Sequence, residues 1–402
     1  MKRVFIVGAK RSAVGSFLGS LNGVHPNDFG SQVLKEVLKE SKVPLDSINE
    51  VLIGNVLSAG LGQGIARQIS INSGISTTIP AYSINMVCGS GMKTVMNAYT
   101  NIALGIHEIS VAGGVESMSN APYLVPGKTR SGVKMGNLEM IDHMIYDSLF
   151  DSFNQYHMGI TAENIAERYN ITREQQDEFS IESQRRAVKA QDSGRFKDEI
   201  VPIVIKTRKG EVIFDQDEFI NHNTSLEKLA KLKPAFKKDG TVTAGSSSGI
   251  NDGASFTILA SEDAVKKYHL TPLFEVIGVG QGGVDPSVMG LGPTPAIKQA
   301  LAFANLDLND MELIELNEAF AAQSLGVIKE LTDAFDITKE QILEKCNVNG
   351  GAIAIGHPVG ASGNRIIVTL IYEMLKRDAK LGLASLCIGG GMGTAVVLKK
   401  VN

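Results

Sequence analysis

A chain of 402 residues is long enough for two or three domains or subdomains with sizeable cores. Its composition, 43% hydrophobic and 20% charged with a net charge of −4, is ordinary for a globular protein and gives no reason to expect nucleic acid or a membrane surface as a partner. Three cysteines exclude a disulfide framework, and no apolar run approaches the roughly 20 residues that span a bilayer. The N-terminus lacks the apolar length and cleavage site of a signal peptide, so we expect a cytoplasmic protein.

The first ~115 residues alternate short apolar strands with amphipathic helices, which is typical of a mostly parallel sheet. An apolar run predicts a strand at residues 4–7, followed by a loop from Gly8 to Gly19. Asp28 is the expected N-cap of the first helix. The further strands are predicted at 51–53 and 109–112, and the helices at 28–42, 65–73 and 92–104.

Residues 117–248 do not continue the alternation of apolar strands and helices, and they are predicted to form an insertion rich in loops. Residues 117–138 contain no acidic residue but three basic ones, Lys128, Arg130 and Lys134, which indicates an irregular cationic loop. The regular elements expected here are helices at 164–170, 173–193 and 227–232 and a hairpin of strands at 201–206 and 211–214.

After residue 250 the apolar strands return. A strand that runs into glycines occurs at 111–114 and again at 387–390, which indicates two related halves. The strands are predicted at 254–259, 274–279, 313–316, 383–388 and 394–399, and the helices at 295–304, from 318 onward and up to about 376.

The stretch from Ser83 to Met92 places Cys88 between a short apolar run and a predicted helix. At such a turn the free N–H groups and the helix dipole favour a thiolate, so we expect a lowered thiol pKa. Gly89 and Gly91 have no Cβ and would let a substrate approach the sulfur closely. This pattern is typical of a cysteine nucleophile; the alternative is a small buried cysteine that only packs.

Three further stretches combine polar or nucleophilic residues with strand ends and glycines. Asn317 and Glu318 follow a strand, His357 lies in the glycine-rich loop 349–363, and Cys387 ends a strand before three glycines. Each has a structural alternative, because Asn317 and Glu318 are possible helix caps, His357 a hydrogen-bonded loop residue and Cys387 a packing residue. No two of them have metal-ligand spacing, so no metal is expected.

Taken together, these stretches resemble the motifs of the thiolase family. Cys88-Gly-Ser-Gly, Asn-Glu-Ala-Phe from Asn317, the Gly-His-Pro-x-Gly-Ala-Ser-Gly loop around His357, and Cys-Ile-Gly-Gly-Gly from Cys387 occur in the family's order and spacing. The similarity covers essentially the whole chain. The Gly-Ser-Gly after Cys88 and the presence of His157 are most similar to the biosynthetic branch of the family.

The resemblance implies an α/β thiolase-like fold, in which two similar βαβαβαββ halves form a five-layered core with an inserted loop domain. The corresponding division of the chain is 1–116 for the first part of the N-terminal half, 117–248 for the loop domain, 249–270 for the return of the N-terminal half and 271–402 for the C-terminal half.

The activity implied by the resemblance is a reversible Claisen condensation of two acetyl-CoA to acetoacetyl-CoA and CoA. In it, Cys88 would carry the acetyl group and Cys387 would exchange a proton with the methyl group of the second substrate. His357 would take the Cys88 proton and, with a water held by Asn317, stabilise the enolate. The backbone amides of Cys88 and Gly389 would hold the acyl oxygen.

Coenzyme A thioesters are the implied substrates, and no cofactor is expected. At the position of an arginine near the nucleotide in related enzymes, this chain has Asn221, for which Lys228 or Lys231 are the expected substitutes. The residues that match substrate-binding positions of the family are His157, Met158, Leu232, Ala235, Phe236, Ala244, Gly245, Ser248, Met289, Ala319 and Phe320.

The cationic loop 117–138 resembles the tetramerisation loop of biosynthetic thiolases, so a homotetramer is expected, with a dimer as the alternative. A degradative 3-ketoacyl-CoA thiolase of broader chain length is the main rival activity, because it shares the catalytic residues. A decarboxylating ketoacyl synthase would have two histidines in place of Asn317 and Cys387. A non-catalytic acyl-CoA-binding protein would be expected to lack some of the four motif residues.

Overall fold

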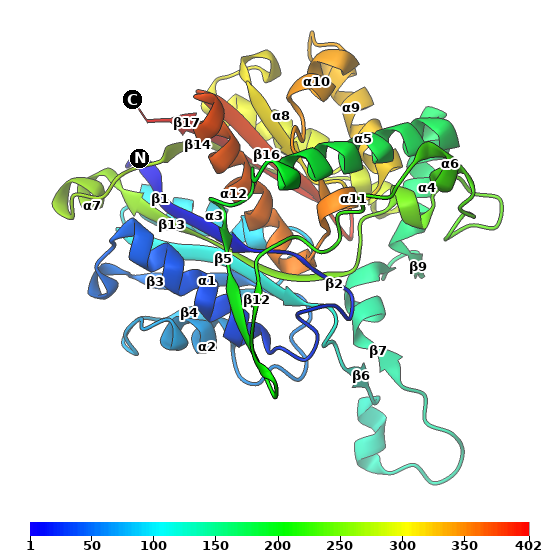
Figure 1. Ribbon diagram of the computed structural model, residues 1–402, viewed down its shortest axis with the longest axis horizontal. Helices are drawn as coiled ribbons and strands as arrows, with labels where there is room; N and C mark the ends of the chain where they lie inside the picture. Colours follow the sequence, from blue (N-terminus) through cyan, green and yellow to red (C-terminus); the bar gives the residue numbers. More distant parts are fainter. Residues whose placement is uncertain (402) are drawn as a thin grey trace.

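Two sets of strands form the framework of the computed structural model, which describes residues 1–401 (Figure 1). The N-terminal set has the order β1-β13-β5-β3-β4 and the C-terminal set the order β14-β17-β16-β15. The N-terminal strands are β1 (Val4–Ser12), β3 (Glu50–Gly54), β4 (Ala81–Ile84), β5 (Ile109–Ser117) and β13 (Asn251–Ser261). The C-terminal strands are β14 (Phe274–Gly283), β15 (Leu313–Leu316), β16 (Leu381–Ile388) and β17 (Met392–Lys400).

The two sets repeat one pairing scheme, which confirms the predicted relation between the halves. β1 pairs antiparallel with β13, β13 antiparallel with β5, and β5 parallel with β3. In the same way, β14 pairs antiparallel with β17, β17 antiparallel with β16, and β16 parallel with β15. The sets join where Phe5 and Ile6 of β1 pair with Glu275 and Phe274 of β14.

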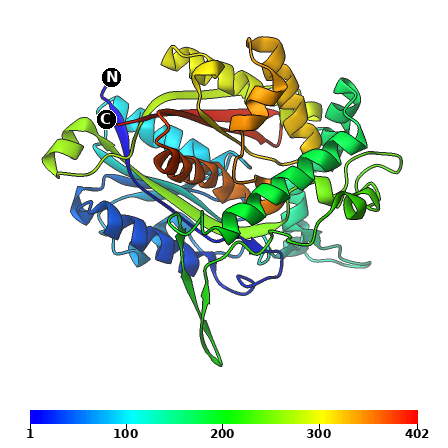
Figure 2. The ribbon, with the colours of Figure 1, turned by 45° about the horizontal axis from the view of Figure 1, so that its top comes forward.

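Two central helices lie between the sets (Figure 2). α3 (Ser90–Ala103) contacts β5 and β17, and α12 (Val359–Arg377) contacts β13, β5 and β16. Most of α12 is buried, as expected of a helix covered on both sides. The two helices approach closely, because a Cβ on Gly363 would lie 2.5 Å from the Met92 nitrogen. The N-terminal ends of α3 and α12 therefore meet in the middle of the molecule.

Outer helices cover the two remaining faces and complete the five layers. α1 (Pro26–Ser41) packs on β13 and β1, and α2 (Ile65–Asn72) packs on β4 and β3. On the other side, α8 (Pro293–Ala304) packs on β14 and β17, with α9 (Ala321–Ala334) and α10 (Lys339–Lys345) beside it. No helix of the described chain, residues 1–401, has both the length and the apolar composition needed to cross a membrane.

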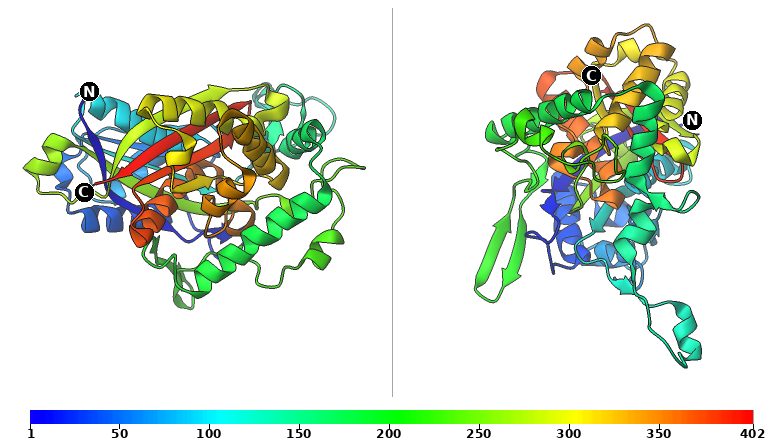
Figure 3. Two further views of the ribbon diagram at one scale, coloured as in Figure 1. Left: turned by 90° about the horizontal axis from the view of Figure 1, so that it is seen from above. Right: turned by 90° about the vertical axis from the view of Figure 1, so that its right-hand side faces the viewer.

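The middle of the chain contributes helices, a hairpin and an extended arm. The arm, which we define as residues 121–142, contains β6 (Tyr123–Leu124) and β7 (Ile141–Asp142) and projects from the body, as does the hairpin (Figure 3). The larger elements here are α4 (Met158–Tyr169), α5 (Arg173–Asp192), α6 (Leu226–Ala230) and the hairpin of β11 (Ile203–Thr207) and β12 (Gly210–Phe214). The predicted hairpin is thus confirmed.

Shorter elements complete the described chain. They are β2 (Gly15–Ser16), η1 (Leu45–Ser47), η2 (Gly127–Ser131), η3 (Ile145–Leu149), β8 (Phe150–Asp151), β9 (Tyr156–His157), β10 (Ile200–Val201), η4 (Ala244–Ser246), α7 (Glu262–Lys267), η5 (Pro286–Leu291), η6 (Leu308–Asp310) and α11 (Ala352–Ile355).

Several predicted boundaries were wrong. α4 begins at Met158 rather than 164, and β5 continues to Ser117 rather than ending at 112. Three further differences have a clear cause. β1 continues through the predicted loop to Ser12, since its second half pairs with β13. His25, not Asp28, caps α1, because its ring nitrogen accepts from the Asn27 amide and Pro26 takes the first helical position. α9 begins at Ala321 rather than 318, since the preceding residues form a separate buried loop.

Candidate active site

Cys88 lies between β4 and α3, as predicted, on a strained backbone. The preceding residue, Val87, has a φ of +47°, an uncommon conformation for a β-branched residue. The thiol is only 9% exposed, and the backbone N–H groups of Gly389 and Cys88 itself are directed at it. Burial nevertheless raises its pKa to about 11, although these two amides act in the opposite direction. The expected lowering of the Cys88 pKa was therefore wrong.

Cys387 and Gly389 come from the end of β16 and face Cys88. Cys387 is buried, and both burial and the nearby Cys88 raise its pKa. The Gly389 amide, two residues further on, is one of the two that reach the Cys88 sulfur. The structure thus brings both cysteines and the glycine turn together.

Asn317 enters the same region from the neighbouring strand. Its backbone N–H donates to the Ser385 carbonyl at 3.0 Å, and β15 runs parallel to β16, so Asn317 and Cys387 leave adjacent carboxyl ends. The Asn317 side chain is buried, yet neither its oxygen nor its nitrogen has a hydrogen-bond partner within residues 1–401. A buried amide without partners is costly, which indicates that these atoms serve a ligand or water.

His357 lies between α11 and α12, and its hydrogen bonds indicate which ring nitrogen carries the proton. Ser362 Oγ is 2.6 Å from Nδ1 and 2.9 Å from the Pro358 carbonyl oxygen. A carbonyl only accepts, so the single hydroxyl proton goes to Pro358 and Nδ1–H of His357 donates to Ser362. Nε2 is then an unprotonated acceptor, and it is buried without a partner in the described chain.

The charge state of His357 agrees with this arrangement. Burial, with a smaller contribution from the nearby Arg365 charge, lowers the pKa of His357 to about 3. The ring is therefore neutral at physiological pH, and Nε2 is free to accept a proton. The His357 backbone is fixed as well, because its N–H donates to Asn251 Oδ1 at 2.9 Å.

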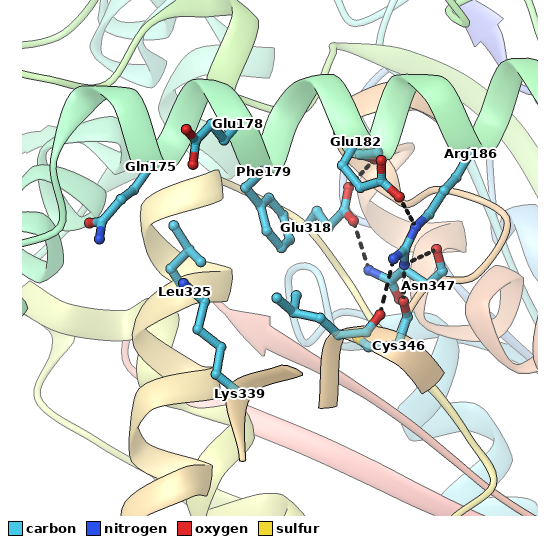
Figure 4. A pocket seen from close by; sticks show the side chains of 12 residues that line it. Gln175, Glu178, Phe179, Glu182, Arg186, Glu318, Leu325, Lys339, Cys346 and Asn347 are labelled. Carbon is cyan, nitrogen blue, oxygen red and sulfur yellow. Dashed lines mark hydrogen bonds and ion pairs between the residues drawn. The ribbon is translucent and has the colours of Figure 1, made fainter. Parts of the chain in front are cut away.

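A buried network behind Asn317 holds its loop in place (Figure 4). The Glu318 carboxylate accepts from Ser183 Oγ at 2.6 Å and from Asn347 Nδ2 at 2.8 Å. Asn347 also binds both the N–H and the carbonyl of Leu316, at 2.8 and 2.7 Å. Arg186 in turn donates to the carbonyl of Asn347. Glu318 is thus a structural support for the loop that carries Asn317, and not a simple helix cap.

Glu116 is a buried acid near the site that the sequence analysis missed. Its carboxylate accepts from the N–H groups of Val56, Leu57 and Gly360, which ties the His357 loop to the end of β3. Burial raises its pKa to about 7 against the effect of these bonds. The one available signal was an acidic residue two positions after the glycines at 113–114.

The residues predicted to bind coenzyme A come together beside the cysteines. The His157 ring stacks on Phe236 with 4.7 Å between centroids, and Phe236 meets Phe320 edge to face at 5.9 Å. The Ser248 N–H donates to the Ala319 carbonyl at 2.9 Å. One buried hydrophobic cluster contains Met158, Met289, Ala319 and Phe320. Leu232 lies against Gly245, and Ala235 and Ala244 of the same two segments are exposed.

The residues expected near the nucleotide of CoA are hydrogen-bonded within their own loop. Asn221 Oδ1 accepts from the Asn223 N–H at 2.9 Å, and Lys228 Nζ donates to the Asn223 carbonyl at 2.6 Å. Lys231 is exposed. Within residues 1–401, no group of three or more His, Cys, Asp or Glu side chains is placed to bind a metal ion.

Sequence comparison identifies the family. Family models described as "Thiolase, N-terminal domain" and "Thiolase, C-terminal domain" match residues 4–263 and 270–400. The chain belongs to the thiolase family. An acetyl-CoA acetyltransferase of Cupriavidus necator is 51% identical over 401 residues, covering 100% of both chains. The predicted thiolase family and α/β fold are thereby confirmed.

Solved structures from both functional branches of the family are similar. The acetyl-CoA acetyltransferase of Bacillus anthracis superimposes with a TM-score of 0.95 at 43% identity, covering 100% of this chain and 99% of that one. The human mitochondrial 3-ketoacyl-CoA thiolase in complex with CoA gives a TM-score of 0.93 at 42% identity, covering 100% of this chain and 98% of that one.

Proposed function

We propose that this thiolase is an acetyl-CoA C-acetyltransferase, which condenses two acetyl-CoA reversibly to acetoacetyl-CoA and CoA through an acetyl-Cys88 intermediate. One observation carries the proposal. Two neighbouring buried cysteines lie where the N-terminal ends of α3 and α12 and the carboxyl ends of β15 and β16 place a neutral histidine acceptor and a buried asparagine amide without partners in the described residues. This set supplies a nucleophile, a second acid–base group and donors for an enolate.

In the first half-reaction, the Cys88 sulfur attacks the thioester and its proton passes to Nε2 of His357. The raised pKa of Cys88 and the lowered pKa of His357 make this transfer unfavourable without substrate. The proton therefore moves to Nε2 as the new carbon–sulfur bond forms, and the free enzyme keeps a neutral thiol. The carbon–sulfur bond of the thioester then breaks, CoA leaves as the thiolate and takes a proton from solvent, and His357 keeps the Cys88 proton on Nε2. The amides of Cys88 and Gly389 then bind the acyl oxygen, each contributing about 2.7–4 kcal/mol to transition-state stabilisation.

In the second half-reaction, the thiolate of Cys387, which has lost its own proton to solvent, removes a proton from the methyl group of another acetyl-CoA. The resulting enolate oxygen accepts hydrogen bonds from the Nε2–H that His357 gained in the first half-reaction and from a water on the free amide of Asn317. The enolate carbon attacks the acetyl group on Cys88, and the Cys88 thiolate leaves and takes its proton back from His357. The glycine at 389 suits this chemistry, because a Cβ there would fill the space between its amide, which reaches the Cys88 sulfur, and the side chains of Val87 and Met158.

The alternative is a degradative 3-ketoacyl-CoA thiolase, as in the human mitochondrial enzyme of that name. A Cβ on Gly389 would lie 3.4 Å from Val87 Cγ1 and 3.6 Å from Met158 Sδ, so both side chains stand close to the amide that binds the acyl oxygen. The two activities share the catalytic residues, and the choice between them rests on the chain length that the enzyme accepts.

We also propose a cytoplasmic homotetramer that binds acetyl-CoA, acetoacetyl-CoA and CoA, with a dimer as the alternative. The projecting arm exposes several large apolar side chains, among them Tyr123, Met135 and Met140, and such surfaces mark protein contacts. The repeated strand pairing supports a division of the chain at residues 116, 248 and 270.

Thiolysis by the purified protein tests the proposed activity. Acetoacetyl-CoA would be compared with 3-ketoacyl-CoA of six to ten carbons, in the wild type and in Cys88→Ala. We expect strong preference for acetoacetyl-CoA and complete loss in the variant. Equal or better turnover of the long substrates would assign the protein to the degradative branch, and no turnover of either would favour acyl-CoA binding without catalysis.

A further inference from the structure

A second groove, separate from the residues assigned to catalysis and CoA binding, lies between α5 and the C-terminal half. Its volume is about 600 Å³, and it adjoins the pocket of Figure 4 at Glu182 and Arg186. Arg185, Arg186 and Lys189 of α5 line one side of the groove, and Arg195 and Arg377 line its far end. The thiolase chemistry proposed above uses none of these cations.

The arginines form two clusters, in each of which two guanidinium groups share one carboxylate. Glu182 accepts from Arg185 at 2.6 Å and from Arg186 at 2.7 Å. Hydrogen bonding to Arg185 and Arg186 lowers the pKa of Glu182, although burial opposes it. The carboxylate is therefore ionised at neutral pH, and this first cluster keeps one positive charge that Glu182 does not neutralise.

The second cluster repeats the arrangement around a buried acid. Glu373 accepts from Arg195 at 2.8 Å and from Arg377 at 2.5 Å, and Asn349 donates to it at 2.7 Å. Burial disfavours the charged form, but these bonds lower the pKa of Glu373 to about 2. Glu373 is thus ionised, and the far end of the groove also keeps one positive charge.

Lys189 adds a further positive charge between the clusters. It lies one helical turn after Arg185, about 6 Å along the α5 axis, and its exposed ammonium has no acidic partner within residues 1–401. Glu344 is the acidic side chain on the opposite wall. The groove therefore has an excess of positive charge, distributed along its length.

We propose that this groove binds an oligophosphate, either inorganic or as part of a nucleoside polyphosphate. Guanidinium groups match the geometry of phosphate oxygens, and a lysine adds a point charge between them. Positive groups at both ends and in the middle of the groove suit a chain of linked phosphates better than a single small anion. The proposal is independent of the reaction catalysed at Cys88.

Isothermal titration calorimetry of the full chain at constant ionic strength, with sodium tripolyphosphate and ATP titrated in parallel, tests this site directly. Arg185 and Lys189 are not among the residues assigned to substrate binding, so affinity that depends on them belongs to the groove. We expect the affinity for tripolyphosphate to fall about tenfold or more in Arg185→Gln/Lys189→Gln, because the variant loses two charged hydrogen-bond donors. Equal affinity for both probes would indicate that phosphate alone is recognised, and tighter ATP binding would indicate a nucleoside polyphosphate.

Matched variants separate this site from general surface charge. Both substituted side chains are exposed on α5, so the variants are expected to unfold at the wild-type temperature. Lys189→Arg should retain binding, Glu344→Gln should tighten it, and Lys35→Gln, an exposed lysine on α1, should leave it unchanged. No measurable tripolyphosphate binding to the wild type, or equal affinity in wild type and the Arg185/Lys189 variant, would overturn the proposal.

Discussion

Replacement of Ser362 by alanine tests whether the hydroxyl fixes the proton of His357 on Nδ1. Ser362 is fully buried and accepts from Nδ1–H at 2.6 Å, while it donates to the Pro358 carbonyl. In Ser362→Ala, the buried Nδ1–H loses its hydrogen-bond partner. The tautomer with the proton on Nε2 is then no longer disfavoured, and that tautomer is unable to accept the Cys88 proton.

The expected size of the effect follows from the loss of one buried partner. An unsatisfied buried donor costs about 1–3 kcal/mol. If that cost appears fully in the transition state, kcat falls about 5- to 150-fold, because each 1.36 kcal/mol is a tenfold change in rate. The KM for CoA should stay near the wild-type value, because Ser362 does not line the predicted CoA-binding segments.

Steady-state thiolysis of acetoacetyl-CoA gives kcat and KM, and thermal unfolding reports stability. Ser180→Ala is a matched control, since Ser180 is also fully buried in a helix and donates to the carbonyl four residues earlier, at 2.7 Å. Both variants should lose similar stability, but only Ser362→Ala should lose kcat. Equal kcat values in Ser362→Ala and wild type would refute the assigned tautomer.

Three further predictions concern the cysteines and the glycine turn. Cys387→Ala should still exchange acetyl groups between acetyl-CoA and labelled CoA but lose condensation about 10²–10⁴-fold, the usual contribution of a general base. Alkylation of Cys88 by iodoacetamide should accelerate about tenfold per pH unit from pH 7 to 10, because the thiol, with a pKa of about 11, ionises progressively over this range. Gly391→Ala should fail to fold, since the φ of Gly391 is +86° and a Cβ would lie 2.2 Å from the Val284 oxygen. Gly389→Ala should fold, because a Cβ there meets no atom closer than 3.4 Å, but it should lose activity.

Each of these predictions has a contradicting result. Loss of acetyl exchange in Cys387→Ala would place Cys387 in the first half-reaction as well. A plateau of the alkylation rate below pH 8 would show that the Cys88 thiol is not held neutral by burial. Wild-type unfolding temperature in Gly391→Ala, measured by differential scanning calorimetry, would contradict the backbone contact with Val284.

The elements predicted correctly are those in which the local pattern carries the information. The hairpin of β11 and β12 and the helices α2 and α5 follow from apolar periodicity and turn residues within a short window. The continuation of β1 to Ser12 was missed because its partner strand, β13, lies more than 200 residues away in the sequence. Strand pairing at such distances has no local signal.

In the candidate site, too, local features were predictable and features set by distant residues were not. The position of Cys88 at a strand-to-helix turn was predictable from its neighbours, but the direction of its pKa shift was not. That direction is decided by the burial that distant segments impose, including the β16 turn that brings Gly389. Glu116 was missed for a similar reason, because its partners are the backbone amides of residues 56, 57 and 360.

The most direct test of the central claim is mass spectrometry of the protein after incubation with acetyl-CoA. The account predicts one added acetyl group per chain, located on the peptide that contains Cys88 and removed when CoA is added. The adduct should be absent in Cys88→Ala and present in Cys387→Ala. A wild-type protein that turns over acetoacetyl-CoA without a covalent acetyl adduct, or with the acetyl group on Cys387, would contradict the account.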